Sequence, residues 1–397
     1  MQSFKRNILV DYIFIFFTSM GFFGTIDILF YKNFGLTFSQ IALIGSVLSA
    51  SILIFEIPTG TFADMIGRKW SIFIAQILFV LQFIILAVSN DFYGFLFASF
   101  IFGLAFAFIS GSRQALVYDT LKKVNKTKLH TKITSYEHVI FASVGIIGSF
   151  FGPRLFELNV YYPIYISIFV YVVSIFVSLF FIEPTDVEKE ISLKKSYLQV
   201  TNSFKRTLKS GRLLWLILFT IISTIGFRVF INLTNQLYLI EIGFSLKELS
   251  YLFVISSIIS SLSGLGYAKF ERIMGEDKSL WFIILMQSLI FGMIGFFTFK
   301  FNAIFFILFG SLRGFIGMVT NHYTNEHLES KERATVLSIG SFLNNLFAIV
   351  FLYLIGILID KSSITFAHLV VGGVITFFGI ILLVTKKKWK DKPIIKI

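Results

Sequence analysis

A short polar stretch, "EIPTGTFADMIGRKW" at residues 56–70, interrupts two long apolar runs. It contains residues suited to tight turns and ion pairs, namely Gly60, Asp64, Gly67, Arg68 and Lys69. Glycine adopts turn conformations that other residues avoid, and it lets neighbouring helices approach closely. Asp119 closes a later apolar run and is expected on the same membrane surface, where its carboxylate can pair with Arg68. These residue types at the end of an apolar run are suited to a polar corner at the membrane surface.

A second group of candidates consists of polar side chains inside the apolar runs. Ionisable groups are costly at bilayer depth, and those that occur there commonly serve a function. The group comprises Asp27, Glu56, Arg113, Arg228, Asn235, Arg313 and Asn345.

Proton exchange and gating are the roles that we weigh for the first members of this group. Asp27 is predicted to exchange a proton as a cavity opens and closes, with plain helix packing as the alternative; Asn235 occupies the matching position in the second half of the chain. For Glu56 and Arg113, the alternatives are a gate and buried ion pairs that only fix the helices.

Substrate binding is the role expected for the remaining members. Arg228 and Arg313 suit an anionic substrate, because guanidinium groups commonly bind anions. Asn345 falls near mid-depth by the helical rise, where its side chain can line a cavity.

The elements that carry these residues are predicted to be membrane helices. Of the 397 residues, 56% are hydrophobic and 14% are charged, whereas soluble domains carry about 25% charged residues. A run of about 20 apolar residues crosses the hydrocarbon core as a helix. Twelve such runs are predicted, at 7–31, 40–62, 71–89, 92–117, 136–156, 161–182, 213–240, 246–268, 280–299, 302–324, 334–359 and 364–385. The fold class is therefore an all-α membrane protein.

The basic residues indicate the orientation of the chain in the membrane. The two termini and the loops after even-numbered runs hold 27 of the 35 lysines and arginines, and the loops after odd-numbered runs hold five. Because basic residues concentrate in cytoplasmic loops, both termini and the polar segment 183–212 are placed in the cytoplasm. The net charge of +13 is thereby assigned to orientation and lipid contact rather than to nucleic acid.

The two halves of the chain resemble each other. "FGLTFSQIAL" (34–43) and "IGFSLKELSY" (242–251) align without gaps at an offset of 208, and each contains a helix-opening capping box. At the same offset, Gly67 falls on Gly275. We predict two pseudo-symmetric six-helix bundles around a midplane cavity. The predicted boundaries are an N-terminal bundle at 1–182, a cytoplasmic linker at 183–212, a C-terminal bundle at 213–385 and a basic tail at 386–397.

Residues 60–69, "GTFADMIGRK", resemble the G-x-x-x-D-x-x-G-R-K loop between the second and third helices of the major facilitator superfamily. "FEIPTG", "SGSRQALVYDTL", "FIEP" and "ERATVLS" are similar to a bacterial branch with many efflux-type permeases. The resemblance implies that Asp64 faces the N-terminal end of the eleventh helix, whose dipole favours a carboxylate. On this basis residues 56–70 are predicted to be a conformational latch between the halves, the alternative being an anchor that only sets orientation. "GSFFGP" at 148–153 is similar to a motif of drug antiporters, but Arg154 departs from it, and Ser99 stands where those antiporters carry an arginine.

The resemblance implies a secondary transporter that works by alternating access, as a monomer, in the bacterial cytoplasmic membrane. Its expected partners are a small-molecule substrate, protons and the lipid bilayer. The first expectation is proton-coupled efflux of small, mostly hydrophobic compounds. The alternatives are proton-coupled uptake of a sugar or organic anion, and a non-transporting sensor or envelope-assembly protein. The sequence has no nucleophile-elbow, Walker or Cys/His metal motif, so we expect no enzyme activity, metal or cofactor, and no nucleic-acid binding.

Overall fold

The computed structural model describes residues 2–184, 210–326 and 330–389, and no side chain is described at 2–3, 212, 264–269, 313–314, 317–326, 330–338 and 387. These residues form helices and no strands, which confirms the predicted all-α class. The chain divides into two compact units. The first contains Met1–Leu36, Leu43–Leu193 and Leu246–Val254, and the second contains Thr37–Ala42, Lys194–Ser245 and Ile255–Ile397. The predicted boundaries of the two bundles and the linker stay a prediction.

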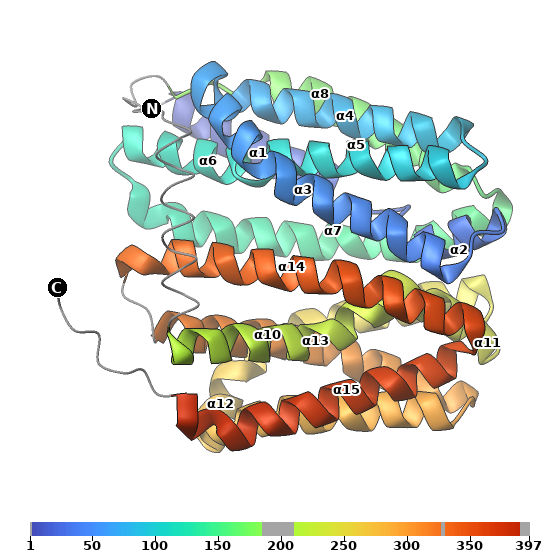
Figure 1. The fold of residues 1–397 in the computed structure, drawn as a ribbon. Coiled ribbons are helices and arrows are strands. Elements are labelled where there is room, and N and C mark those ends of the chain that lie inside the picture. Colours follow the sequence, from blue (N-terminus) through green and yellow to red (C-terminus); the bar gives the residue numbers. More distant parts are fainter. Residues whose placement is uncertain (1, 185–209, 327–329, 390–397) are drawn as a thin grey trace. The chain divides into compact units, whose positions relative to one another are not determined.

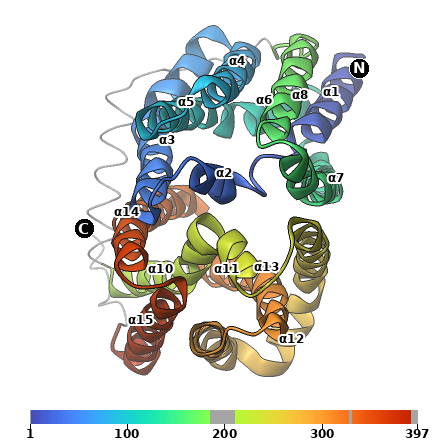
Figure 2. The same cartoon turned by 90° about the vertical axis from the view of Figure 1, so that its right-hand side faces the viewer.

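The first unit is built from long helices joined by short turns. They are α1 (Gln2–Thr18), α2 (Asp27–Asn33), α3 (Phe38–Ile66), α4 (Arg68–Val88), α5 (Phe92–Ser110), α6 (Ser112–Lys123), the short 3-10 helix η1 (Thr127–Leu129), α7 (His130–Leu158) and α8 (Tyr162–Leu179). Helix α4 packs against α5 and α8, and α1 packs against α7 and α8 (Figures 1 and 2). The predicted capping box that opens α3 is confirmed, because the Thr37 amide donates to Gln40 Oε1 at 2.9 Å and the Gln40 amide donates to Thr37 Oγ1 at 3.2 Å.

The second unit repeats this helical construction, except that Leu246–Val254 at the start of α12 belongs to the first unit and Thr37–Ala42 at the start of α3 belongs to the second. It contains α10 (Gly211–Val229), the π-helix η2 (Phe230–Thr234), α11 (Asn235–Glu241), α12 (Leu246–Phe296), the 3-10 helix η3 (Lys300–Asn302), α13 (Ala303–Glu326), α14 (Ser330–Lys361), α15 (Ile364–Thr385) and the 3-10 helix η4 (Lys386–Trp389). Helix α10 packs against α13, α14 and α15 (Figure 1). Helix α12 includes the predicted eighth and ninth spans, joined at Gly275, where φ is +71°.

The described residues contain ten helices long and apolar enough to cross a membrane, so the predicted count of twelve is not reproduced. One difference lies in the first predicted span, 7–31, which is broken into α1 and α2. The other lies in the tenth, where only Lys300–Leu312 is counted, as a shorter apolar helix. An apolar run sets how much of the chain lies in the membrane but does not require that every residue in it be helical.

The break in the first span has a counterpart in the seventh. Between α1 and α2, residues 19–26 are not helical, and between α10 and α11 the chain forms η2 at Phe230–Thr234. Helices α2 and α11 each have seven residues and begin at positions related by the offset of 208 found in the sequence. The deformation of the first helix of each half is therefore part of the duplicated pattern.

Two glycines of α7 leave room for the irregular segment in the first span. A Cβ atom added at Gly148 would lie 2.9 Å from the Gly21 backbone nitrogen, and one added at Gly152 would lie 2.6 Å from the Phe22 carbonyl oxygen. Both distances are shorter than ordinary van der Waals contact. The "GSFFGP" motif therefore lets α7 pack closely against the backbone that follows α1.

Candidate functional site

The turn between α3 and α4 depends on Gly67. Its φ of +117° and ψ of 148° belong to a region that residues with a side chain rarely adopt. A Cβ atom at this position would also lie 2.9 Å from Glu183 Oε2. The backbone conformation thus favours glycine at this corner, and a side chain there would also make the end of the Glu183 side chain shift.

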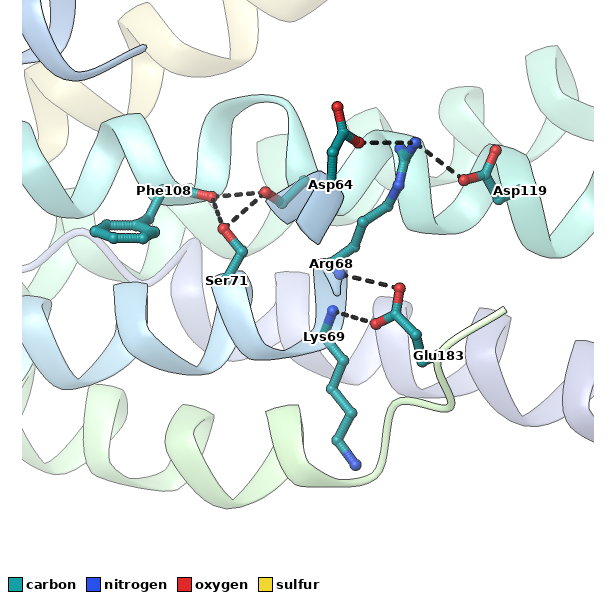
Figure 3. Close-up of polar contacts among 8 residues, drawn as sticks. Asp64, Arg68, Lys69, Ser71, Phe108, Asp119 and Glu183 are labelled. Atoms are coloured by element: carbon teal, nitrogen blue, oxygen red, sulfur yellow. Dashed lines mark hydrogen bonds and ion pairs between the residues drawn. The ribbon is translucent and has the colours of Figure 1, made fainter. Parts of the chain in front are cut away.

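Glu183 caps the helix that begins at this corner (Figure 3). The Arg68 amide donates to Glu183 Oε1 at 2.9 Å, and the Lys69 amide donates to Glu183 Oε2 at 2.8 Å. A carboxylate is favoured there because the first amides of a helix are unpaired and carry partial positive charge. The sequence did not identify Glu183 as a site residue, although "FIEP" places a carboxylate at the end of an apolar run.

The side chain of Arg68 connects α3, α4 and α6 (Figure 3). Its Nη2 atom lies 3.0 Å from Asp119 Oδ2, which confirms the predicted pairing, and 3.9 Å from Asp64 Oδ1. Exposure distinguishes the two carboxylates, because the Asp64 side chain is 45% exposed and that of Asp119 is 11% exposed. Asp119 is therefore the closer and more buried partner of Arg68, and Asp64 is the more exposed of the two carboxylates.

Near the ion pairs, hydrogen bonds of two serines connect α4 to the junction of α5 and α6. Ser71 Oγ donates to the Phe108 carbonyl oxygen at 2.8 Å, and Ser112 Oγ lies 2.9 Å from Ser71 Oγ (Figure 3). Both serines are buried. These bonds fix the position of α6, which carries Asp119, relative to α4, which carries Arg68.

A cavity of about 370 Å³ lies beside this ion-pair network, within the first unit. Its lining includes several of the residues predicted from the sequence, namely Glu56, Gly60, Asp64 and Arg68. Ala107, Ser110, Gly111 and Ser112 supply much of the remaining wall. The structure thus brings Glu56 to the same side of the unit as the latch candidates, although its carboxylate is exposed.

Arg113 lies apart from this cavity and pairs with two carboxylates that the sequence did not single out. Its guanidinium donates to Asp11 Oδ1 at 2.9 Å and to Glu137 Oε2 at 3.0 Å. In the sequence, Asp11 lies within a predicted apolar run and Glu137 lies at the edge of another. An acidic residue in an apolar run indicates a buried charge, but its pairing with Arg113 depends on the tertiary packing of α1, α6 and α7.

Asp27 and Asn235 occupy equivalent places in the two halves and make equivalent contacts. Asp27 Oδ1 accepts from the Ile28 amide at 2.9 Å, and Asn235 Oδ1 accepts from the Gln236 amide at 2.8 Å. Each residue is the first of a seven-residue helix that follows the deformed segment. Because an uncharged asparagine makes the same contact, this bond does not require the Asp27 charge, and the predicted proton exchange at Asp27 stays a prediction.

Two predicted substrate residues meet in the second unit. Arg228 Nη2 donates to Asn345 Oδ1 at 2.9 Å, and one turn earlier Thr224 Oγ1 donates to Asn344 Oδ1 at 3.2 Å. The contacts continue the packing of α10 on α14 beyond a small apolar cluster formed by Ile217, Ile221, Ile339 and Leu343. Arg228 makes no ion pair with any residue that the structure describes, and the side chain of Arg313 lies outside the described residues.

The contrast between Asp64 and Asp119 leads to a stability prediction for the first unit. Asp119→Asn is expected to lower the free energy of unfolding by about 1–3 kcal/mol, because it removes a short charge-assisted bond to Arg68. Asp64→Asn is expected to cost less than about 1 kcal/mol, because its carboxylate is half-exposed and more distant. Denaturation of the two purified variants in detergent checks the difference, and equal losses would contradict the assignment of Asp119 as the main partner.

The latch itself stays a prediction. Its expected contact at the N-terminal end of the eleventh helix falls on side chains at 330–338, which lie outside the described residues.

Comparisons with known proteins give consistent results. A family model described as Major Facilitator Superfamily matches residues 9–350. The chain is 22% identical to the quinolone resistance protein NorA of Staphylococcus aureus (strain MSSA476) over 402 residues, covering 98% of each chain. It is 28% identical to the uncharacterized MFS-type transporter YxaM of Bacillus subtilis (strain 168) over 246 residues, which span 60% of this chain and 59% of that protein.

Solved structures share the fold at low sequence identity. A mutant of the nucleoside transporter NupG superposes with a TM-score of 0.80 at 15% identity, covering 98% of this chain and 99% of that one. A bacterial homolog of the human lysosomal transporter Spinster gives a TM-score of 0.70 at 13% identity, covering 99% of this chain and 98% of that one.

Proposed function

The chain belongs to the Major Facilitator Superfamily and is a membrane transporter rather than an enzyme, and on that premise we propose that it exports small hydrophobic compounds that carry an anionic group, in exchange for protons. Both termini are proposed to lie in the cytoplasm, as the distribution of basic residues predicts. The two halves of the chain would alternate access to a central substrate site, and a monomer would be sufficient.

The observation that supports an anionic substrate group is the environment of Arg228. This guanidinium is half-buried in the last turn of α10, near the middle of the apolar span Leu213–Glu241, and Asn345, its hydrogen-bond partner in the described chain, is uncharged. A guanidinium has five N–H donors, so several remain for a ligand after the bond to Asn345. A carboxylate or phosphate on the substrate would supply the missing negative charge with bidentate geometry.

The direction of transport is supported by the relatives. NorA is named for quinolone resistance and matches this chain over nearly its full length. Quinolones are compact aromatic acids, which agrees with a site that combines an arginine with an apolar helix surface. Uphill transport is proposed to draw on an ion gradient, because the sequence contains no nucleotide-binding motif that would supply ATP-driven transport, and the proposed ion is the proton.

Arg228→Gln is expected to reduce transport of an anionic compound by about 10–100-fold, because a hydrogen bond to a charged group contributes about 1.5–3 kcal/mol. Transport of an uncharged hydrophobic compound is expected to change much less. The measurement uses inverted membrane vesicles with an imposed proton gradient, and compares a quinolone carboxylic acid, a neutral hydrophobic compound and a nucleoside.

The matched control is Arg272→Gln, which removes an exposed arginine from α12. If Arg228→Gln and Arg272→Gln transported the quinolone equally well, Arg228 would not recognise the anion. If only the nucleoside moved in the wild-type vesicles, the export of hydrophobic anions would be wrong and metabolite uptake would replace it.

A further inference from the structure

Three charged side chains of the first unit meet in its interior, and none of them lines the cavity described above. Arg113 from α6 lies between Asp11 from α1 and Glu137 from α7, at 2.9 Å and 3.0 Å. The side chain of Asp11 is 0% exposed, that of Glu137 is 7% exposed and that of Arg113 is 18% exposed. We refer to these three residues as the buried triad.

The charges of the buried triad do not balance. Two ionised carboxylates against one guanidinium leave one negative charge in a site that water hardly reaches, which is strongly unfavourable. The second oxygen of Asp11, Oδ2, has no hydrogen-bond partner in the described part of the chain. A fully ionised aspartate would leave this buried oxygen charged and unpaired, whereas a protonated one would not.

Among the described residues, Arg113 is the only cation that forms an ion pair with Asp11 or Glu137, and the exposed Lys132 lies with its Nζ atom 5.9 Å from the centroid of the Tyr136 ring. Tyr12 and Tyr136 face the triad from α1 and α7, with their rings edge to face at a centroid distance of 6.4 Å. Helix α8, which also packs against α1, has no charged residue along its length. On α6, Asp119 is paired with Arg68, and on α1 the buried Asn7 amide donates to Thr120 Oγ1 at 2.9 Å.

We propose that the buried triad is a proton-binding site, in which Asp11 and Glu137 together hold one exchangeable proton beside Arg113. This inference deepens the proposed proton-coupled export and rests on it for its biological meaning. The proton comes from water on one side of the membrane, binds a carboxylate oxygen, and is returned to water on the other side. With the proton bound the site is neutral, and after its release the site carries one negative charge.

The position of the triad connects proton binding to movement of α1. Asp11 lies two turns before Thr18, where α1 ends and the irregular segment begins. The same segment packs against the glycines of α7, the helix that also carries Glu137. A shift of α1 along α7 would therefore open or close the triad to water, since two of its three side chains lie on these two helices.

Single substitutions of the two carboxylates test whether the triad binds a proton. Removing either carboxylate leaves one acid paired with one guanidinium, which is neutral without a bound proton. Asp11→Asn and Glu137→Gln should therefore each abolish the proton site, although they change different helices. Asp91→Asn is the control, because Asp91 lies outside the triad and caps α5 by accepting from the Gly94 amide, which asparagine also does.

Infrared pH-difference spectroscopy of the purified full-length protein in liposomes measures the site without any substrate. A buried carboxylic acid with few hydrogen bonds absorbs at a higher frequency than exposed acids, so its band is separate. The wild type and Asp91→Asn should show one such reversible band, and Asp11→Asn and Glu137→Gln should both lack it. Persistence of the band in both single variants would overturn the proposal.

Folding and function are separated by two further readouts. Size-exclusion profiles and thermal unfolding identify a variant that fails to fold, in which case the other single variant carries the test. If the band depends on the triad but no compound moves protons, the proposed export is wrong while the proton site stands. If export is proton-coupled and the band is unaffected in both variants, the proton binds elsewhere and the triad is only structural.

Discussion

Arg113→Gln is expected to lower the free energy of unfolding by about 3–5 kcal/mol, the largest loss of stability that we predict for a single substitution in this protein. Arg113 is the counter-ion of two carboxylates, one fully buried and the other 7% exposed. Glutamine keeps hydrogen-bonding capacity but leaves at least one buried negative charge without a cation, even when the two carboxylates share a proton. Chemical denaturation of the purified protein in detergent, with Arg272→Gln as the exposed-arginine control, measures the loss.

A rescue experiment shows whether the loss comes from uncompensated charge. Adding Asp11→Asn and Glu137→Gln to Arg113→Gln removes all three charges and should restore most of the stability, because uncharged polar groups are far less costly to bury than unpaired ions. A triple variant no more stable than Arg113→Gln alone would contradict the electrostatic account and would indicate that the shape of the arginine side chain is what matters.

Gly67→Ala is expected to have the largest effect on the loop. The backbone conformation at φ +117° is one that alanine adopts at a cost of about 1–3 kcal/mol. The added Cβ also makes the end of the Glu183 side chain shift, which weakens its hydrogen bonds to the two amides at the start of α4. We expect a lower melting temperature. We also expect transport turnover to fall at least about tenfold, because a distorted loop that raises the free-energy barrier of the transport cycle by about 1.4 kcal/mol slows it tenfold.

Gly45→Ala is the matched control for this prediction. Gly45 lies within α3, and a Cβ atom there meets no described atom within 4 Å. Alanine is also a better helix former than glycine, so this change should be neutral or slightly stabilising. If Gly67→Ala and Gly45→Ala melted and transported alike, neither the turn conformation nor the Glu183 cap would be important.

The helical class and the duplication could be predicted from the sequence because both are encoded locally. Apolar runs reveal membrane helices regardless of their partners. The offset of 208 relates Gly67 to Gly275, and both have positive φ in the structure. The same offset relates Asp27 to Asn235, and each begins a seven-residue helix.

The break in the first span could not be predicted from the apolar pattern. Residues 19–26 are as apolar as the helices beside them, and their conformation depends on the close approach of α7 at Gly148 and Gly152. The first predicted run is therefore not reproduced as one continuous helix. A hydropathy pattern shows which residues are buried from water, but it does not show which neighbouring helices interrupt a helix.

In the candidate site, contacts that follow from local sequence could be predicted, and contacts that depend on tertiary packing could not. Arg68 and Asp119 could be paired in advance because both follow from one loop and one helix end on the same surface. Glu183, Asp11 and Glu137 were missed as partners because helices distant in sequence bring them to Arg68, Lys69 and Arg113. Arg228 and Asn345 were predicted separately for depth and chemistry, and packing of α10 on α14 brings them into contact.

The most direct test of the account measures proton movement when a substrate is added. Purified wild-type protein in liposomes that contain a pH-sensitive dye is given a pH gradient and then a quinolone carboxylic acid. We predict that the quinolone dissipates the gradient in the wild type and that Asp11→Asn exchanges labelled for unlabelled quinolone without moving protons. Quinolone exchange in the wild type with no accompanying proton flux would contradict proton-coupled export.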